Sequence, residues 1–387
     1  MTASADLAAQ LMEHFAEATG LVGTAAPRRY LWTDAFGVCT FLGLARSSGE
    51  NLYRRRALEL VDQVHRILGR HREDDPRTGW ISGLEDDEGA RHPTLGGLRI
   101  GKSLPERKPG KPLNERMEWE RDGQYFHYLT RWMHALHNTA EQTGEERYLT
   151  WGKELARVAH RAFTREEPGG RRRLVWKMSI DLSRPLVDSS GQHDPLDGLI
   201  TYLELQTTDA RGTVLPDLQP FIAEAEGMCR DIQMGTIDPL GIGGLLVDAS
   251  RLAQMVLGRG LEGRGLLARS PRELLERLLI ESSLSLSHFS RTHSPDVPAD
   301  RRLPFRELGL SIGMRALEHA GPLLSREPDL GKALDSVLEF SHLGQEMEAF
   351  WSDPAHRRAS TWRGHEDINT VTLATALAPE GYVALEG

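Results

Sequence analysis

The chain has little cysteine, no excess of basic charge and no long apolar run. Two cysteines, Cys39 and Cys229, among 387 residues exclude a disulfide-stapled scaffold and a cysteine-rich metal site, and they suit a cytoplasmic protein. The 47 Lys and Arg against 56 Asp and Glu give a net charge of −9, so we expect neither nucleic acid nor a membrane surface as partner. No apolar stretch reaches the about 18 residues of a membrane-spanning helix.

Signals for β-strands are also scarce. The best one, 173–180, lies between Gly169-Gly170 and Pro185 and predicts a small β-hairpin inside a long connection. Long connections run over 79–118, 169–192 and 290–304, and each ends just before a segment that we predict to be a buried helix. Loops that lengthen on one face of a rigid scaffold often build its functional site.

Two kinds of predicted helix alternate along the chain. One kind starts with an acidic residue beside turn-formers and continues rich in Gly, Ala, Leu and aromatics; its starts are 32–37, 121–126, 193–198, 238–241, 306–309 and 365–369. The acidic residue suits the unpaired backbone N–H groups of a first turn. The other kind has one charged face; its members are 6–19, 52–70, 146–163, 221–229, 271–289 and 330–351.

A helix that is apolar all round is buried, whereas a striped helix faces solvent. Six of each in alternation predict an all-α fold, an (α/α)6 barrel or toroid, in a single domain over 1–387. This pattern resembles the six-hairpin glycosidase superfamily and the related N-acylglucosamine 2-epimerase toroids over nearly the whole chain. The resemblance implies a funnel at the starts of the inner helices and a small-molecule or oligosaccharide substrate there; no oligomeric state follows from it.

The acidic residues at the helix starts would then share one rim. They are Asp34, Asp122, Asp194 or Asp197, Asp238, Glu307 and Glu366. Carboxyl groups whose pKa values are pushed apart can act as general acid and general base, as in glycoside hydrolysis. The alternative for each of them is a plain helix cap.

We predict Asp122 as the general acid, because Gly123 after it lets a ligand approach the backbone. A second carboxylate, Asp34 or Glu366, would orient or deprotonate water, with Asp197 as a further candidate. The binding candidates are aromatic platforms for a sugar and basic groups for an anionic substituent: Trp32, Trp119, Tyr125, Trp362, Arg99 and Lys102. The alternatives are aromatic packing and a solvated basic loop that pairs with neighbouring glutamates.

The segment Gly96–Ser103 fits the phosphate-binding pattern G-x-x-x-x-G-K-[ST] letter for letter. That motif needs a hydrophobic strand before it and a helix after it, and neither is predicted here. We therefore expect no nucleotide cofactor. Neither cysteine forms a Cys-His pair at ligand spacing, so we expect no metal of the zinc-cyclase kind and no other cofactor.

These residues favour a carbohydrate-active enzyme, a glycoside hydrolase on a sugar that can be anionic. One alternative is a sugar epimerase working through His193 or His365, since a histidine beside a carboxylate can move protons near neutral pH. A second is a lyase or cyclase of an apolar substrate. A third is a non-catalytic helical scaffold that binds another molecule in the funnel.

Overall fold

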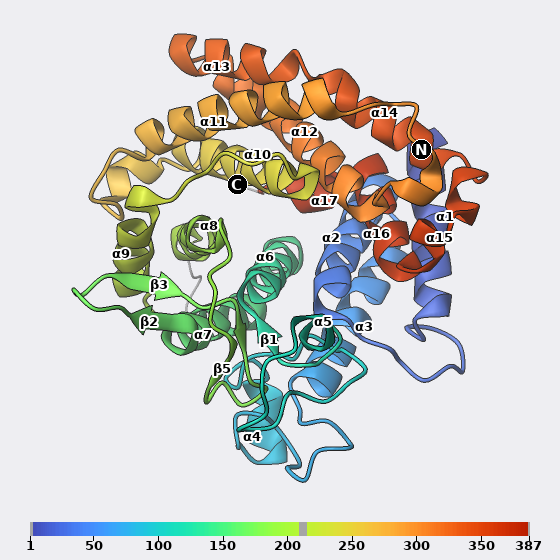
Figure 1. Ribbon diagram of the computed structural model, residues 1–387, viewed down its shortest axis with the longest axis vertical. Helices are drawn as coiled ribbons and strands as arrows, with labels where there is room; N and C mark the ends of the chain where they lie inside the picture. Colours follow the sequence, from blue (N-terminus) through green and yellow to red (C-terminus); the bar gives the residue numbers. More distant parts are fainter. Residues whose placement is uncertain (1–2, 209–214, 386–387) are drawn as a thin grey trace. The chain divides into compact units, whose positions relative to one another are not determined.

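A computed structural model of the chain describes residues 3–208 and 215–385 (Figure 1). The chain divides into two compact units, each assembled from separate stretches of sequence. Unit 1 holds residues 1–18, 39–54 and 233–387, and unit 2 holds 19–38 and 55–232. Each unit is described by itself below, and the single domain inferred from the sequence stays a prediction.

Two helices belong partly to each unit, and the remaining elements belong to one. The shared helices are α2 (Leu31–Ser48) and α3 (Asn51–Leu68). Unit 1 further contains α1 (Ala3–Ala18), α10 (Pro239–Ala253), α11 (Pro271–Thr292), α12 (Pro304–Leu324), α13 (Pro328–Leu338), α14 (Ser341–Ser352), α15 (Ser360–Arg363), α16 (Glu366–Leu377) and α17 (Glu380–Val383).

Unit 2 adds six helices and all the strands in the part of the chain that the structure describes. The helices are α4 (Asp86–Arg91), α5 (Glu115–Trp119), α6 (Phe126–Thr143), α7 (Glu146–Phe163), α8 (Asp194–Thr207) and α9 (Gln219–Met228). The strands are β1 (Gln124–Tyr125), β2 (Thr164–Glu166), β3 (Arg172–Leu174), β4 (Lys177–Met178) and β5 (Pro185–Val187).

The predicted buried and striped helices are present, with one exception. The buried helices α2, α6, α8, α10, α12 and α16 begin within a few residues of the predicted starts, and α7 has both predicted ends. In α8 nearly every residue from Asp194 to Leu205 is buried, whereas α13 buries a stripe of Leu330, Leu334 and Val337. One prediction was wrong: the helix expected over 330–351 is two helices, because the chain turns at residues 339–340 between α13 and α14.

The small β-structure predicted within the long connection is present. The expected strand 173–180 is divided between two sheets. One is the hairpin of β2 and β3; the other has the order β1-β4-β5, with Gln124 opposite Met178. This second sheet ties the start of α6 to the long connection before α8, and it therefore places loop residues beside two buried helices.

The segment Gly96–Ser103 forms an irregular loop after α4, with neither a strand before it nor a helix directly after it. The rejection of a phosphate-binding motif is thereby confirmed. One helical stretch, Pro239–Gly258, is long and apolar enough to cross a membrane by composition, with mean hydropathy 1.3, although we expected none. Because 78% of this stretch is buried inside the structure, α10 fits a core helix packed on α11 and α12.

Helices α10 and α12 touch through backbone at glycine. A Cβ built on Gly243 would lie 2.1 Å from the carbonyl oxygen of Gly309, and one on Gly313 would lie 2.6 Å from the carbonyl oxygen of Gly243. No side chain fits there, since the obstacle is backbone of the neighbouring helix. This approach explains why the buried helices are rich in glycine despite its cost within a helix.

We predict that Gly243→Ala destabilises the protein by about 1–3 kcal/mol or more, because the two helices must separate to admit a methyl group. Urea denaturation would measure the change. The matched control is Gly227→Ala in α9, where nothing lies within 4 Å of the added Cβ. That variant should gain up to about 1 kcal/mol from helix propensity. Equal stability of the two variants would contradict the backbone-contact explanation.

Candidate active site

Asp122 lies in the loop between α5 and β1, and its side chain is fully buried. Its Oδ2 accepts from Arg99 Nη1 at 2.6 Å and from Arg72 Nη1 at 3.3 Å. Its Oδ1 accepts from the backbone N–H groups of Gly101 and Gly123, both at 3.0 Å. With both oxygens engaged, the carboxylate is not placed to reach a leaving group. The structure thus overturns the general-acid prediction and gives Asp122 the role of fixing the surrounding loops.

The guanidinium group of Arg99 is also hydrogen-bonded within the protein. Besides Asp122, it donates to the carbonyl oxygens of Arg70 and Ile67, both at 2.7 Å, and its side chain is 8% exposed. A guanidinium group with three internal acceptors is not available to an anionic ligand, so that prediction was wrong. Lys102 is half-buried, and its Nζ lies 5.1 Å from the centre of the Tyr30 ring.

The side chain of Asp34 is hydrogen-bonded to the backbone at the start of α2. Its Oδ2 accepts from the backbone N–H of Tyr30 at 2.8 Å, while its own N–H donates to the carbonyl oxygen of Tyr30 at 2.9 Å. Arg29 Nη1 lies 3.5 Å from Oδ1, and the Asp34 residue is 1% exposed. The helix-cap alternative therefore describes Asp34, and its use as a catalytic base is not supported.

The candidates at the start of α16 lie in unit 1. Glu366 is half-exposed, and its Oε1 is 3.5 Å from His14 Nε2. The ring of His365 is exposed and meets the ring of Phe305 edge-on at 5.9 Å. Trp362 is buried, with its ring tilted against Trp351. Its ring faces are thus taken by packing, which excludes the predicted sugar platform.

Trp32 and Tyr125 are likewise poor platforms. Trp32 is 7% exposed and packs on Phe36 within its own helix, and Tyr125 is 2% exposed. Trp119 differs, because it is 53% exposed and meets Trp176 edge-on at 4.6 Å. Of the three, Trp119 alone keeps a ring that a ligand can stack on.

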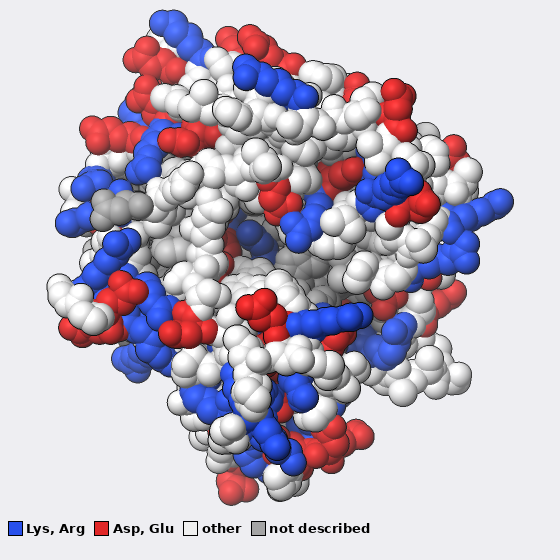
Figure 2. All heavy atoms as spheres, in the orientation of Figure 1, with Lys and Arg blue, Asp and Glu red and all other residues white. Residues whose placement is uncertain are grey.

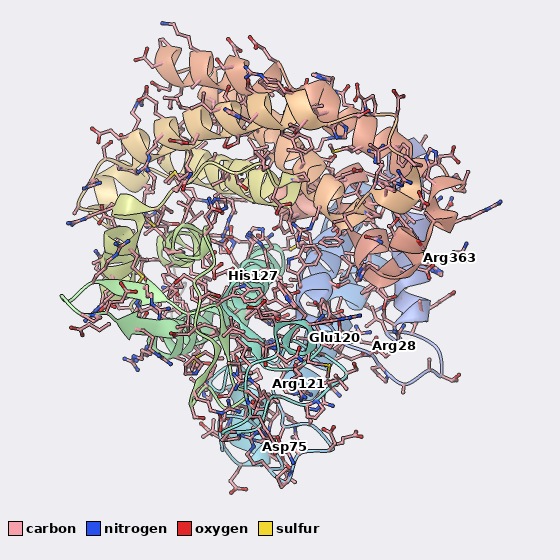
Figure 3. The ribbon with its side chains drawn as sticks, viewed as in Figure 1. Arg28, Asp75, Glu120, Arg121, His127 and Arg363 are labelled. Atoms are coloured by element: carbon pink, nitrogen blue, oxygen red, sulfur yellow. The ribbon has the colours of Figure 1, made fainter. Side chains whose placement is uncertain are left out.

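An aromatic cluster surrounds the first turn of α6. We use this name for Tyr30, Trp119, Tyr125, His127, Tyr128 and Trp176. Tyr125 stacks on Trp176 at 4.9 Å, and the hydroxyls of Tyr30 and Tyr128 are hydrogen-bonded at 2.6 Å. Figure 3 shows His127 at the start of α6. The predicted binding residues Trp119 and Tyr125 both belong to this cluster, and Trp176 is a member that we did not predict.

Two carboxyl groups from the first turn of α8 are buried against polar side chains of α6. Asp194 and Asp197 are 6% and 3% exposed, and they lie one turn apart on α8. Asp197 Oδ1 lies 3.0 Å from Arg131 Nη1, and its Oδ2 accepts a short hydrogen bond from Thr130. The two helices pack against each other along this side.

Asp194 has a different environment. Its carboxyl group lies over Gly191, where a Cβ would come within 2.5 Å of it, and its Oδ2 has no hydrogen-bond partner in the described residues. Burial, with a smaller contribution from the negative charge of Asp197, raises the pKa of Asp194 to about 7. A carboxyl group in this state holds a proton near neutral pH and can donate it.

His127 lies beside the same charges. Burial lowers its pKa to about 4; Asp197 opposes this change and Arg131 adds to it. The imidazole is therefore neutral at neutral pH and can accept a proton. His193, the predicted histidine, is half-buried at the residue before α8, where its side chain does not cap the helix.

Buried polar side chains continue along the facing sides of α6 and α8 beyond their first turns, and we call this series the polar row. Glu204 Oε1 accepts from His134 Nδ1 at 2.7 Å and lies 2.8 Å from His137 Nδ1; all three side chains are buried. Sequence reasoning missed these residues and Arg131. A signal was present: polar residues recur at 194, 197, 201 and 204 in α8 and at 127, 131, 134 and 138 in α6, which is one face of each helix.

Metal ligands do not gather in the described residues: no group of three or more His, Cys, Asp or Glu side chains is placed to hold an ion there. Both cysteines are buried, and they do not form a disulfide. The carboxyl groups of Asp194 and Asp197 and the imidazole of His127 can take part in proton transfer at this site.

No family model matches the sequence, and no curated protein matches it. Solved structures of other proteins do match its fold. The α-1,6-mannanase GH76A of Salegentibacter sp. HEL1_6, as an inactive variant with two aspartates replaced and in complex with α-1,6-mannotetrose, has a TM-score of 0.54 at 10% identity over 98% of this chain and 99% of its own. The cellobiose 2-epimerase from Spirochaeta thermophila DSM 6192 has a TM-score of 0.50 at 15% identity over 97% and 96%.

The chain has an (α/α)6 toroid fold. The likeness runs over nearly the full length of both proteins, which also confirms the resemblance to the six-hairpin toroids. At 10–15% identity it carries over the fold alone, so the roles of individual residues rest on the geometry described above.

We predict that Asp122→Asn destabilises the protein by about 3–5 kcal/mol, because it leaves the buried guanidinium of Arg99 without its counter-charge. Thermal or urea unfolding would measure this. The control is Asp74→Asn: that carboxylate also pairs with Arg72, at 2.6 Å, but its side chain is 53% exposed. The control should change stability by less than about 1 kcal/mol. An Asp122→Asn protein as stable as wild type, yet without turnover, would restore the catalytic role.

A second prediction follows from the raised pKa of Asp194, whose ordinary value is 3.8. The protonated group favours folding at acidic pH, and this contribution is lost as the pH rises through about 7. Asp194→Asn stays neutral, so its free energy of unfolding should match wild type near pH 4 and exceed it by up to about 4 kcal/mol above pH 7.

Urea titrations at several pH values would give that difference. Asp197→Asn is the control, because it loses the ion pair with Arg131 and should be less stable than wild type at pH 8. An Asp194→Asn variant that is less stable than wild type at pH 8 would show that Asp194 is ionised and well partnered in the folded protein.

Proposed function

We propose that this protein is a carbohydrate-active hydrolase that cleaves a glycosidic bond with Asp194 and Asp197. The observation that carries the proposal is the different environment of two carboxyl groups one turn apart: Asp194 has a pKa of about 7, whereas Asp197 faces Arg131. Two carboxyl groups with separate protonation states are what glycoside hydrolysis needs. A toroid fold shared with a mannanase supports the same class of substrate.

In the proposed reaction Asp194 is the general acid. Its Oδ2 is buried and has no hydrogen-bond partner in the described residues, so its proton is not held by another protein group and would pass to the bridging oxygen of a sugar chain that reaches it. Proton transfer to that oxygen releases the leaving sugar. Asp197 remains a carboxylate beside the developing positive charge and directs the attacking water, with Arg131 and Thr130 holding it in position.

Aromatic side chains would bind the sugar next to these groups. Sugar rings present apolar C–H faces, which pack on aromatic rings. Trp119 is exposed, and it joins Trp176, Tyr125 and His127 through ring contacts. A sugar chain that stacks on Trp119 would therefore run along the aromatic cluster toward the start of α6.

The test uses Asp194→Asn on a panel of aryl glycosides. Loss of the general acid should lower kcat by about 10²–10⁴ for a poor leaving group, because that oxygen needs a proton. For a dinitrophenyl leaving group, which needs none, the loss should be much smaller. Wild-type activity should also fall as the pH rises above about 7, where Asp194 loses its proton.

Asp122→Asn assayed at a temperature where it is folded serves as the matched carboxylate control and should keep the leaving-group pattern of wild type. Full activity of Asp194→Asn on poor leaving groups would remove Asp194 from the role.

One observation favours a second candidate, a sugar epimerase. The neutral imidazole of His127 lies among the same side chains and could take a proton from a sugar carbon; a 2-epimerase shares the fold. Reaction in D₂O separates the two, since an epimerase incorporates deuterium at carbon without cleaving the chain. The lyase, cyclase and scaffold alternatives have no supporting observation among the described residues.

A further inference from the structure

A cavity in unit 2 is lined by residues other than the carboxyl pair. It measures about 520 Å³ and is bounded by the loop 105–114, by α5 and by Arg121. Pro105, Pro112 and Met117 form apolar walls. Figure 3 marks Arg121 directly after α5. Figure 2 shows acidic and basic side chains interleaved over the part of the molecule that carries α4 and α5, so charge at the cavity has to be judged pair by pair.

The acidic residues that line the cavity are already neutralised. Glu118 is 3% exposed and lies 3.0 Å from Arg107 Nε and 3.1 Å from Lys177 Nζ. Glu106 accepts from Arg77 Nη2 at 3.0 Å and from the backbone N–H of Ile180 at 2.6 Å. Neither carboxylate is left to balance further cations at the cavity.

Three cations at the cavity remain without an acidic partner. Lys108 and Lys111 are exposed and, within the described ranges, belong to no ion pair; Arg121 donates from Nη1 to the carbonyl oxygen of Pro105 at 3.0 Å and likewise meets no carboxylate. This surplus stands out in a chain of net charge −9. The alternative of a solvated basic loop that pairs with neighbouring glutamates holds for Arg107 and fails for Lys108 and Lys111.

The frame of the cavity is fixed by hydrogen bonds. Arg107 donates from Nη1 to the carbonyl oxygen of Lys111 at 2.8 Å and from Nη2 to that of Leu186 at 2.7 Å. Arg184 in turn donates to the carbonyl oxygen of Arg107. The cations are therefore presented by a loop that side chains from elsewhere in unit 2 hold in place, which lowers the entropy cost of binding.

The cavity adjoins the aromatic cluster. Lys177, which pairs with the cavity residue Glu118, lies with its Nζ 5.2 Å from the centre of the Tyr125 ring. Trp119 follows Glu118 in the chain and meets Trp176. A ligand on the exposed ring of Trp119 would thus lie beside α5, whose residues Met117 and Glu118 line the cavity, and beside Trp176 of the aromatic cluster.

We propose that this cavity is a binding subsite for an anionic group, a carboxylate, sulfate or phosphate, carried by a sugar chain. Lys108, Lys111 and Arg121 contact the anion, and Pro105, Pro112 and Met117 pack on the apolar part of the same sugar unit. The sugar part of the ligand rests on the function proposed above. The anionic substituent expected at Arg99 and Lys102 is thereby assigned to a different set of cations.

The test measures binding by calorimetry, independently of catalysis. Four probes are used: a trisaccharide of uronic acid, its sulfated and its phosphorylated neutral counterparts, and the unmodified neutral trisaccharide. At least one anionic probe should bind wild type about tenfold or more tightly than the neutral one, and added salt should weaken that preference. The Lys108→Gln/Lys111→Gln variant should lose about tenfold for the anionic probe and nothing for the neutral one.

Lys332→Gln removes an 81% exposed lysine on α13 and serves as the control for loss of a surface lysine elsewhere, with wild-type affinity expected. Equal affinity for all four probes, or an unchanged double variant, overturns the proposal. Asp194→Asn is included and should bind the anionic probe like wild type. If that variant also keeps full hydrolytic activity while the anion preference persists, the catalytic assignment fails and the anion subsite stands.

Discussion

The chemistry of this site depends on one constraint: a row of polar side chains is buried between α6 and α8 and must find its partners there. Arg131 and Thr130 meet Asp197, and His134 and His137 meet Glu204. Buried polar groups without partners are costly, so such rows are usually complete. Asp194, in the first turn of α8, has one buried oxygen without a partner in the described residues and holds a proton instead.

Much of the fold could be predicted because apolar periodicity is a property of the sequence itself. The helix α7 was predicted with both ends, and the starts of the buried helices followed from acidic residues beside turn-formers. The break between α13 and α14 could not be predicted, since neither Gly nor Pro stands at 339–340. The division of the expected strand 173–180 between two sheets could not be predicted. Its second part, β4, pairs with β1, some fifty residues earlier, and pairing partners at that distance leave no local signal.

Acidic residues at helix starts were found from the sequence, but the use of each one is decided by partners elsewhere in the chain. Asp122 is held by Arg99 and by Arg72, which is 50 residues away, and Asp34 is held by the backbone of Tyr30. Nothing in the local sequence distinguishes them from Asp194. The distinguishing feature was the helical spacing of polar residues in α6 and α8, which predicts facing rows only when both helices are considered together.

The contrast between residues that hold the fold together and residues of the candidate site explains how one fold can host different reactions. The α10–α12 glycine contact and the Asp122 ion pairs secure packing and loops, whereas Asp194 and His127 lie in the first turns of α8 and α6. A mannanase and a 2-epimerase share the fold at 10–15% identity to this chain. In the function proposed above, the choice between hydrolysis and epimerisation depends on which group carries the proton. Here it resides on a carboxyl oxygen, while the nearby imidazole is neutral, and a protonated carboxyl group is suited to a leaving oxygen rather than to a C–H bond.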